Sequence, residues 1–158
     1  MSNELLSKAI TFINYEADLL DQGEFHSWLD LWQQDGVYIV PIDLQTNDFL
    51  NTLNYAYDDK KMREKRVHRL YSGESISTTP RARTVRLTGR HRLVKVDGEH
   101  LEVRCAQSLW EFRKGNKKNY IADITYKLIQ KNEEFTLQEK IIRVINADDY
   151  LYSIGYIL

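Results

Sequence analysis

The second half of the chain is a succession of long strand-like segments joined by tight turns, and this pattern constrains the fold more than any other feature. Thr84 to Val96 leads to Asp97-Gly98, a dipeptide typical of two-residue hairpin turns. The segments 100–113, 120–128 and 135–146 follow, with apolar residues on alternate positions and turn residues between them. Four such strands in succession predict an antiparallel meander.

The first half indicates helices followed by one strand. Apolar residues recur at helical spacing from Asn3 to Asp21, and a second short helix is expected from Glu24 to Trp32. Gly36 to Ile42 is rich in β-branched and aromatic residues, which predicts a strand. After a polar stretch, Asp58 is expected to cap a third helix that stops near Ser72-Gly73.

Helices first and antiparallel strands afterwards predict an α+β fold with the helices packed on one face of the sheet. Strands of this length twist strongly, so a cone or half-barrel is favoured over a flat sheet. The chain has 158 residues, of which 42% are hydrophobic and 28% charged. We therefore expect one folded domain spanning residues 1–158.

The charge balance and the cysteine count exclude several classes of protein. There are 22 Lys and Arg against 23 Asp and Glu, so no overall field attracts nucleic acid or an anionic membrane. The basic segment 84–95 is better explained as an interface strand that pairs with acidic residues elsewhere. A single cysteine, Cys105, cannot form an internal disulfide, and no window approaches the ~20 apolar residues that span a bilayer. We expect a cytoplasmic protein.

No catalytic or metal-binding motif occurs in the sequence. The four histidines are scattered, and no HxxxH or HxxE spacing links them. The seven glycines form neither a dinucleotide fingerprint nor a phosphate-binding loop. The sequence therefore predicts no catalytic, cofactor or metal site in this chain.

Charged residues cluster at the expected third helix, where two explanations stay open. Asp58 and Asp59 lie at its start, and Arg66 and Arg69 near its end, positions that the helix dipole favours. Helix stability alone could explain them. A docking surface explains them equally well, because arginine is over-represented at protein interfaces. The candidate interface residues are Tyr57, Asp58, Asp59, Arg66, Arg69, Arg81 and Arg83.

Aromatic residues make up 11% of the chain, including ten Tyr and three Trp. Such large, rigid side chains suit a sheet surface or an interface. Five of them could cover subunit faces or pack in the core with similar ease. These are Trp110, Phe112, Tyr150, Tyr152 and Tyr156.

Four stretches carry a resemblance to a known family over nearly the whole chain. They are Tyr15-Glu16-Ala17 with Asp35-Gly36-Val37-Tyr38 inside residues 12–41, the run 57–70, Pro80-Arg81-Ala82-Arg83-Thr84, and Ile145-Asn146-Ala147-Asp148. Their order and spacing resemble the beta subunits of Rieske-type aromatic-ring-hydroxylating dioxygenases. One departure is Val85-Arg86-Leu87, where the family leads us to expect more basic residues.

The resemblance implies a cone-shaped fold of the nuclear transport factor 2 type, also called cystatin-like, and a non-catalytic small subunit that supports assembly. Its partners would be alpha subunits and other beta subunits, as three alpha with three beta or as a beta trimer alone. A reductase or ferredoxin would act indirectly. In the family, the alpha subunit carries the Rieske iron-sulfur cluster and the mononuclear iron, and the beta subunit carries no cofactor.

Two other functions stay open at this point. The chain could be a free-standing cone-fold enzyme, an isomerase or dehydratase of a small hydrophobic substrate. In that case Asp35 would be the general base, and Tyr38, His91 or Tyr126 would orient a substrate oxygen. A third possibility is a binding or scaffold trimer with no metalloprotein partner.

Overall fold

The fold is α+β, as predicted, with helices before a long run of strands. The computed structural model describes residues 2–76, 82–147 and 157–158. The helices are α1 (Ser2–Asp21), α2 (Phe25–Leu29) and α3 (Lys60–Ile76). The strands are β1 (Trp32–Pro41), β2 (Asn54–Asp58), β3 (Arg83–Asp97), β4 (His100–Arg113), β5 (Asn116–Lys131) and β6 (Glu134–Val144).

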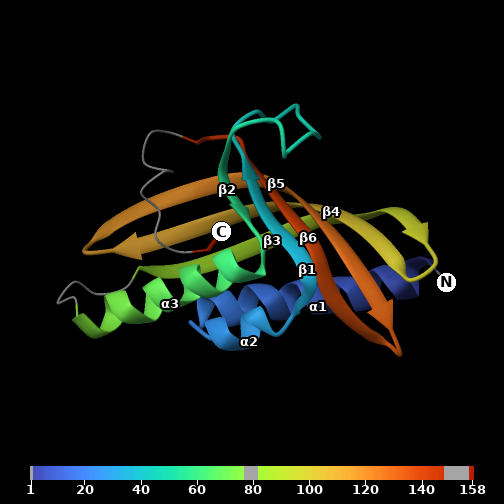
Figure 1. Ribbon diagram of the computed structural model, residues 1–158, viewed down its shortest axis with the longest axis horizontal. Coiled ribbons are helices and arrows are strands. Elements are labelled where there is room, and N and C mark those ends of the chain that lie inside the picture. The colour runs from blue at the N-terminus through green and yellow to red at the C-terminus, as the bar shows by residue number, and fades with distance from the viewer. Residues whose placement is uncertain (1, 77–81, 148–156) are drawn as a thin grey trace.

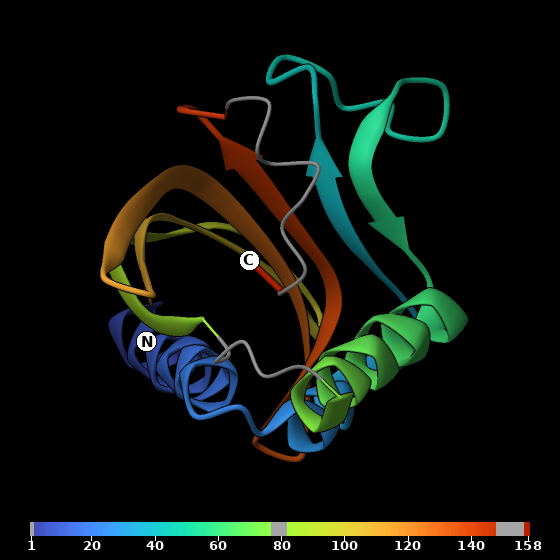
Figure 2. The ribbon, with the colours of Figure 1, turned by 90° about the vertical axis from the view of Figure 1, so that its left-hand side faces the viewer.

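The strands form one mixed sheet of six strands in the order β2-β1-β6-β5-β4-β3. The four predicted strands, β3 to β6, are an antiparallel meander, whereas β1 runs parallel to β6. The sheet curls into an arch, and the helices lie along its open side (Figures 1 and 2). Figure 2 also places residues 157–158, labelled C, inside the arch. The predicted curved sheet with helices on one side is confirmed.

The turns between the long strands lie where the sequence predicts them. Gly98 and Gly115 have φ angles of +61° and +79°, which glycine adopts without strain. The β5–β6 turn uses Asn132 and Glu133 at φ angles of 52° and 68° instead of glycine. In β3, the pairing with β4 shifts register between Gly89 and Arg92. Such bulges bend a strand and increase its twist, which contributes to the curl of the sheet.

Three predicted boundaries are wrong. Trp32 belongs to β1 rather than to the second helix, because it pairs with Leu137 of β6. The stretch expected to be a polar loop contains β2, whose Tyr57 lies opposite Ile39 of β1. The third helix continues to Ile76 instead of stopping near Ser72-Gly73. Pairing with distant strands thus overrides the local turn and polarity signals in the first two cases.

The core lies between the concave face of the sheet and the helices. Alternate residues of β4 and β5 point into it, as the period-two pattern predicts. Ile157 and Leu158 belong to the same core and are 0% and 4% exposed. The inward-facing residues of the two strands are Leu101, Val103, Cys105, Gln107, Leu109, Tyr120, Ala122, Ile124, Tyr126 and Leu128.

Candidate functional site

Two of the predicted interface residues are bound to each other inside the chain. Arg66 Nε donates a hydrogen bond to Asp58 Oδ2 at 2.6 Å, and the two side chains are 17% and 2% exposed. This ion pair joins α3 to the end of β2. Asp58 is therefore not the helix cap, as the sequence suggested. The carboxylate of Asp59 caps α3 instead, accepting from the Met62 amide at 2.9 Å.

The other predicted interface residues divide between the surface and the part of the chain that the structure leaves out. Tyr57 is 37% exposed, and Asp59, Arg69 and Arg83 are exposed as well. Arg81 lies outside the described residues, as do Tyr150, Tyr152 and Tyr156. Tyr57 lies on β2, Asp59 between β2 and α3, Arg69 on α3, and Arg83 on β3 at the opposite edge of the strand order from β2.

A strip of exposed apolar side chains covers the outer face of β3, β4 and β5. Val85 lies opposite Trp110, and Arg83 lies opposite Phe112. On the next row, Leu87 lies opposite Ser108, which in turn pairs with Ile121. The outer strip consists of Val85, Leu87, Trp110, Phe112 and Ile121, whose exposures range from 40% to 59%. Contiguous exposed apolar surface of this kind is typical of protein contacts.

Arg63, which the sequence analysis did not single out, organises the start of β1. Between the pairs Trp32–Leu137 and Val37–Glu139, β1 has four residues, 33–36, and β6 has one, residue 138. This part of β1 therefore bulges. The buried Arg63 guanidinium donates to the carbonyls of Gly36 and Gln33 and lies 4.3 Å from the centroid of a Trp32 ring. Burial lowers the pKa of Arg63. A Cβ on Gly36 would come within 2.7 Å of Trp32, so the bulge requires glycine here.

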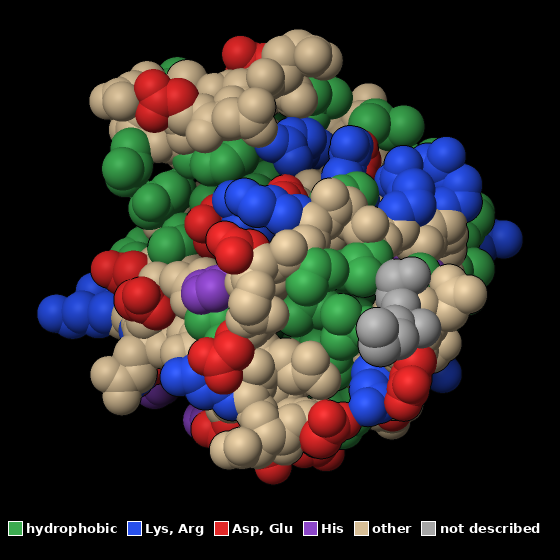
Figure 3. Space-filling view, turned by 90° about the vertical axis from the view of Figure 1, so that its right-hand side faces the viewer, with side chains coloured by type: hydrophobic (Ala, Val, Ile, Leu, Met, Phe, Trp, Pro, Cys, Tyr) green, Lys and Arg blue, Asp and Glu red, His purple; other side chains and the backbone are tan. Residues whose placement is uncertain are grey.

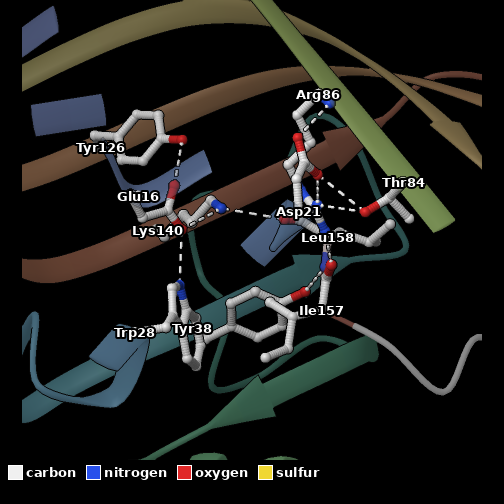
Figure 4. Close-up of polar contacts among 10 residues, drawn as sticks. All are labelled: Glu16, Asp21, Trp28, Tyr38, Thr84, Arg86, Tyr126, Lys140, Ile157 and Leu158. Atoms are coloured by element: carbon white, nitrogen blue, oxygen red, sulfur yellow. Dashed lines mark hydrogen bonds and ion pairs between the residues drawn. The ribbon is translucent and has the colours of Figure 1, made fainter. Parts of the chain in front are cut away.

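The first of two polar clusters in the interior is centred on Glu16 of α1. Its carboxylate accepts from Lys140 Nζ at 2.8 Å, from Trp28 Nε1 at 2.8 Å and from the Tyr126 hydroxyl at 3.0 Å (Figure 4). The side chains of Glu16 and Lys140 are both 0% exposed. Desolvation lowers the pKa of Lys140, which the charge of Glu16 opposes, and it raises the pKa of Tyr126.

The second cluster joins the end of α1 to β3. The Asp21 carboxylate accepts from the Arg86 guanidinium, from the Arg86 backbone amide at 2.9 Å and from the Thr84 hydroxyl at 2.9 Å. Thr84 Oγ1 accepts a further bond from Arg86 at 3.0 Å. Arg86 thus pairs with an acidic residue of its own chain, and these contacts tie the end of α1 to the first residues of β3.

The last two residues of the sequence bind to these clusters. The Leu158 amide donates to the Tyr38 hydroxyl at 2.8 Å, and Lys140 Nζ donates to the Leu158 carbonyl at 3.1 Å. The Arg86 guanidinium donates to the Ile157 carbonyl. Burial raises the pKa of Tyr38 to about 12. Figure 4 shows Tyr38, Arg86 and Lys140, which come from β1, β3 and β6, beside these two residues.

The sequence contains a signal that could have revealed the buried pair. Glu16 falls on the apolar face of α1, between Ile13 and Leu20, and Lys140 falls on the inward-facing positions of β6 with Ile142. A charged residue on an apolar face calls for a partner of opposite charge. Neither pattern alone identifies that partner, because the two residues are 124 positions apart.

The four residues of the enzyme hypothesis do not assemble into a site. Asp35 is exposed, whereas Tyr38 and Tyr126 are buried with their hydroxyls bound to Leu158 and Glu16. A ring nitrogen of His91 lies 3.1 Å from the Thr88 hydroxyl. The general base would therefore lie on the surface, whereas two of the groups meant to orient its substrate are buried and hydrogen-bonded elsewhere.

The described part of the chain lacks features of two other classes of protein. It holds no group of three or more His, Cys, Asp or Glu side chains that could bind a metal. It contains no helix long and apolar enough to cross a membrane. On the face shown in Figure 3, both basic and acidic side chains surround hydrophobic ones, and several Lys and Arg side chains gather toward the upper right.

The fold belongs to the nuclear transport factor 2 class, also described as cystatin-like. The chain is similar to an NTF2-like protein with a cystatin-like fold from Novosphingobium aromaticivorans, with a TM-score of 0.60 at 13% identity over 96% of this chain and 91% of that one. Within this class, residues 15–148 match the model of the family described as ring hydroxylating beta subunit. The chain belongs to that family.

Two relatives agree with this assignment. The chain is 30% identical to the small oxygenase component of the p-cumate 2,3-dioxygenase system of Pseudomonas putida, over 85% of this chain and 76% of that protein. It is also similar to the crystal structure of the beta subunit of benzoate 1,2-dioxygenase from Burkholderia mallei. That similarity has a TM-score of 0.79 at 25% identity and covers 94% and 95% of the two chains. The predicted family and fold are thus confirmed.

Proposed function

We propose that this chain, a small (beta) subunit of an aromatic-ring-hydroxylating dioxygenase, is itself non-catalytic and supports the assembly of alpha subunits. The family match over residues 15–148 is the observation that carries the proposal. The alpha subunit would hold the Rieske cluster and the mononuclear iron that activates dioxygen. The contribution of the beta subunit is positional, since it fixes where the alpha subunits sit relative to one another.

The arrangement of polar groups supports a structural role. Four ionisable groups of the interior, Glu16, Lys140, Asp21 and Arg86, are bound to one another or to backbone groups of the same chain. Groups held in this way stabilise the fold, and in the full chain their hydrogen bonds are made within the chain. Their organisation differs from that of a catalytic site, in which polar groups converge on an open position.

The outer surface supports the proposed contacts with partners. Arg83, a predicted interface residue, lies opposite Phe112 in the sheet and therefore extends the outer strip. Exposed aromatic side chains beside arginine are enriched at protein interfaces. We propose that the strip, with Tyr57, Asp59, Arg69, Arg81 and Arg83, contacts the other subunits of a complex of three alpha and three beta chains. Asp58 and Arg66 would act indirectly, by fixing α3 on the sheet.

Co-expression with the alpha subunit tests the assembly role. Size-exclusion chromatography with light scattering, together with iron analysis, should find iron in a particle of about six chains. The variant Trp110→Glu should shift this particle toward separate subunits, because it places a charge in the centre of the outer strip. Lys131→Glu, an exposed charge reversal at the β5–β6 turn, is the matched control and should assemble normally.

Two results would overturn the proposal. One is an iron-free particle of this chain alone that ignores the alpha subunit. The other is turnover of a small molecule by the purified chain that Asp35→Asn abolishes, since that would restore the enzyme hypothesis. Equal assembly of Trp110→Glu and Lys131→Glu would remove the outer strip from the interface while leaving the family assignment intact.

A further inference from the structure

Three side chains recognise the backbone of Ile157 and Leu158. The Ile157 carbonyl accepts from Arg86, the Leu158 amide donates to Tyr38, and the Leu158 carbonyl accepts from Lys140. The side chains that contact these two residues come from β1, β3 and β6. Both aliphatic side chains lie in the hydrophobic core. A protein binds a short peptide ligand by the same combination of buried side chains and bonded backbone groups.

The three recognising side chains are each held in place by contacts that do not involve residues 157–158. Lys140 is fixed by Glu16, and Arg86 by Asp21 and Thr84. The Tyr38 ring packs against the Trp28 ring with centroids 6.1 Å apart. Because the anchors come from α1, α2 and β3, each of the three side chains has contacts that do not require Ile157 and Leu158. The arrangement is preorganised in the sense that favours binding.

We propose that Tyr38, Arg86 and Lys140 form a binding site for a short aliphatic peptide segment, which the chain fills with its own Ile157 and Leu158. The ligand class is an acylated dipeptide with two aliphatic side chains, because the described contacts with Ile157 and Leu158 involve two main-chain oxygens and one amide. This site lies in the core and is distinct from the outer strip. If the site does not bind the peptide, the proposed assembly role is unaffected. If the assembly role is wrong, the proposed peptide site is equally unaffected.

The first test uses the full chain and one backbone amide. In protein labelled with 15N-leucine, the Leu158 amide should exchange with deuterium at least about a hundredfold more slowly than in a free peptide, because it is buried and bonded to Tyr38. Tyr38→Phe should remove most of this protection. Tyr126→Phe is the matched control, because its hydroxyl binds Glu16 instead of Leu158. Unprotected exchange in the native chain, or equal effects of the two variants, would overturn the proposal.

The second test asks whether the site accepts the same ligand from solution. A chain that ends at residue 156 should unfold at a lower temperature than the full chain, and acetyl-Ile-Leu-amide at millimolar concentration should restore about 3–8 °C of the loss. The peptide with a methylated leucine nitrogen cannot donate to Tyr38 and should have a much smaller effect. The truncated chain carrying Tyr38→Phe should not distinguish the two peptides.

Equal stabilisation by the two peptides in the truncated chain would show that the dipeptide binds without the Tyr38 contact, and it would overturn the proposal. The same holds if neither peptide stabilises a truncated chain that is folded. If the truncated chain does not fold, the exchange rates of Leu158 in the full-length variants decide the question by themselves.

Discussion

Glu139 and Lys140 are neighbours in β6, yet their side chains lie in opposite environments. Glu139 points outward and meets Lys127 at 3.8 Å, and these two side chains are 28% and 42% exposed. Lys140 points inward and meets Glu16 at 2.8 Å, and both of these side chains are 0% exposed. One residue step along a strand therefore separates a solvated ion pair from a fully buried one.

The two pairs have different consequences for the fold. Water and salt screen the outer pair, so either member can be removed at little cost. The inner pair cannot lose one member without stranding a charge in the core. The inner pair also ties α1 to the sheet and shares Lys140 with Leu158. The inner face of the sheet thus holds the fold together, and the outer face carries the exposed strip that we propose as a contact surface.

The largest effect should come from breaking the inner pair. Lys140→Met leaves the Glu16 carboxylate buried without its cation, and the free energy of unfolding should fall by about 3–5 kcal/mol. Urea denaturation followed by tryptophan fluorescence measures this change. The double variant Glu16→Gln with Lys140→Met removes the stranded charge and should recover part of the loss. A loss below about 1 kcal/mol for the single variant would contradict the role given to the pair.

Alkaline pH should weaken the interior through the buried phenol of Tyr38. Because burial raises the pKa of Tyr38 from 10.0 to about 12, the unfolded chain releases this proton first as the pH rises. The resulting stabilisation is complete below pH 10 and is lost between pH 10 and about pH 12. It amounts to about 2–3 kcal/mol for a shift of this size.

Comparison of variants isolates this contribution. Cys105 and Tyr126 also have pKa values raised by burial and act in the same direction, whereas the lowered pKa of Lys140 acts in the opposite one. Tyr38→Phe should therefore flatten, but not abolish, the loss of stability in urea titrations between pH 9 and 12. Tyr15→Phe, at a tyrosine that is 51% exposed, should leave the profile unchanged. Parallel profiles for wild type and Tyr38→Phe would refute the assignment.

A smaller effect is expected at the junction of β2 and α3, where two adjacent aspartates again differ. Asp58 is buried against Arg66, and Asp59 is exposed at the helix cap. Asp58→Asn should lower the free energy of unfolding by about 1–2 kcal/mol, because it weakens a charge-assisted hydrogen bond. Asp59→Asn should change it by a few tenths at most, since asparagine caps helices equally well. Thermal unfolding of both variants measures the difference, and equal losses would contradict this account.

The sequence predicts the sheet better than it predicts the first half of the chain. Alternation in the segments that became β4 and β5, with turn residues between them, is a local signal that defines both strands and their buried faces. The strand β2 gives no such signal, because Asn54–Asp58 is short and depends on pairing with β1. The parallel pairing of β1 with β6 joins residues about a hundred positions apart and has no local signature.

The site is harder to predict, for a related reason. Of the charged residues that the pattern singles out, Asp59 and Arg69 are exposed, whereas Asp58 and Arg66 pair with each other inside the chain. The pattern cannot distinguish Asp58 from Asp59, because their roles depend on where β2 ends. It also passes over Arg63, whose partners are backbone carbonyls of β1. A side chain that binds backbone groups far away in the sequence has no partner side chain at a fixed spacing. A sequence pattern therefore cannot detect it.

The smallest effect is expected on the outer face. Lys127→Met removes the partner of Glu139 in a pair whose charged atoms are 3.8 Å apart and partly solvated, so the free energy of unfolding should change by no more than about 0.5 kcal/mol. The same urea titration used for Lys140→Met measures it, with the same lysine-to-methionine change on the opposite face of the sheet. A loss as large as that of Lys140→Met would mean that the outer face also holds the fold together. The outer face would then be less free to vary with its partners than the comparison of Glu139 with Lys140 implies.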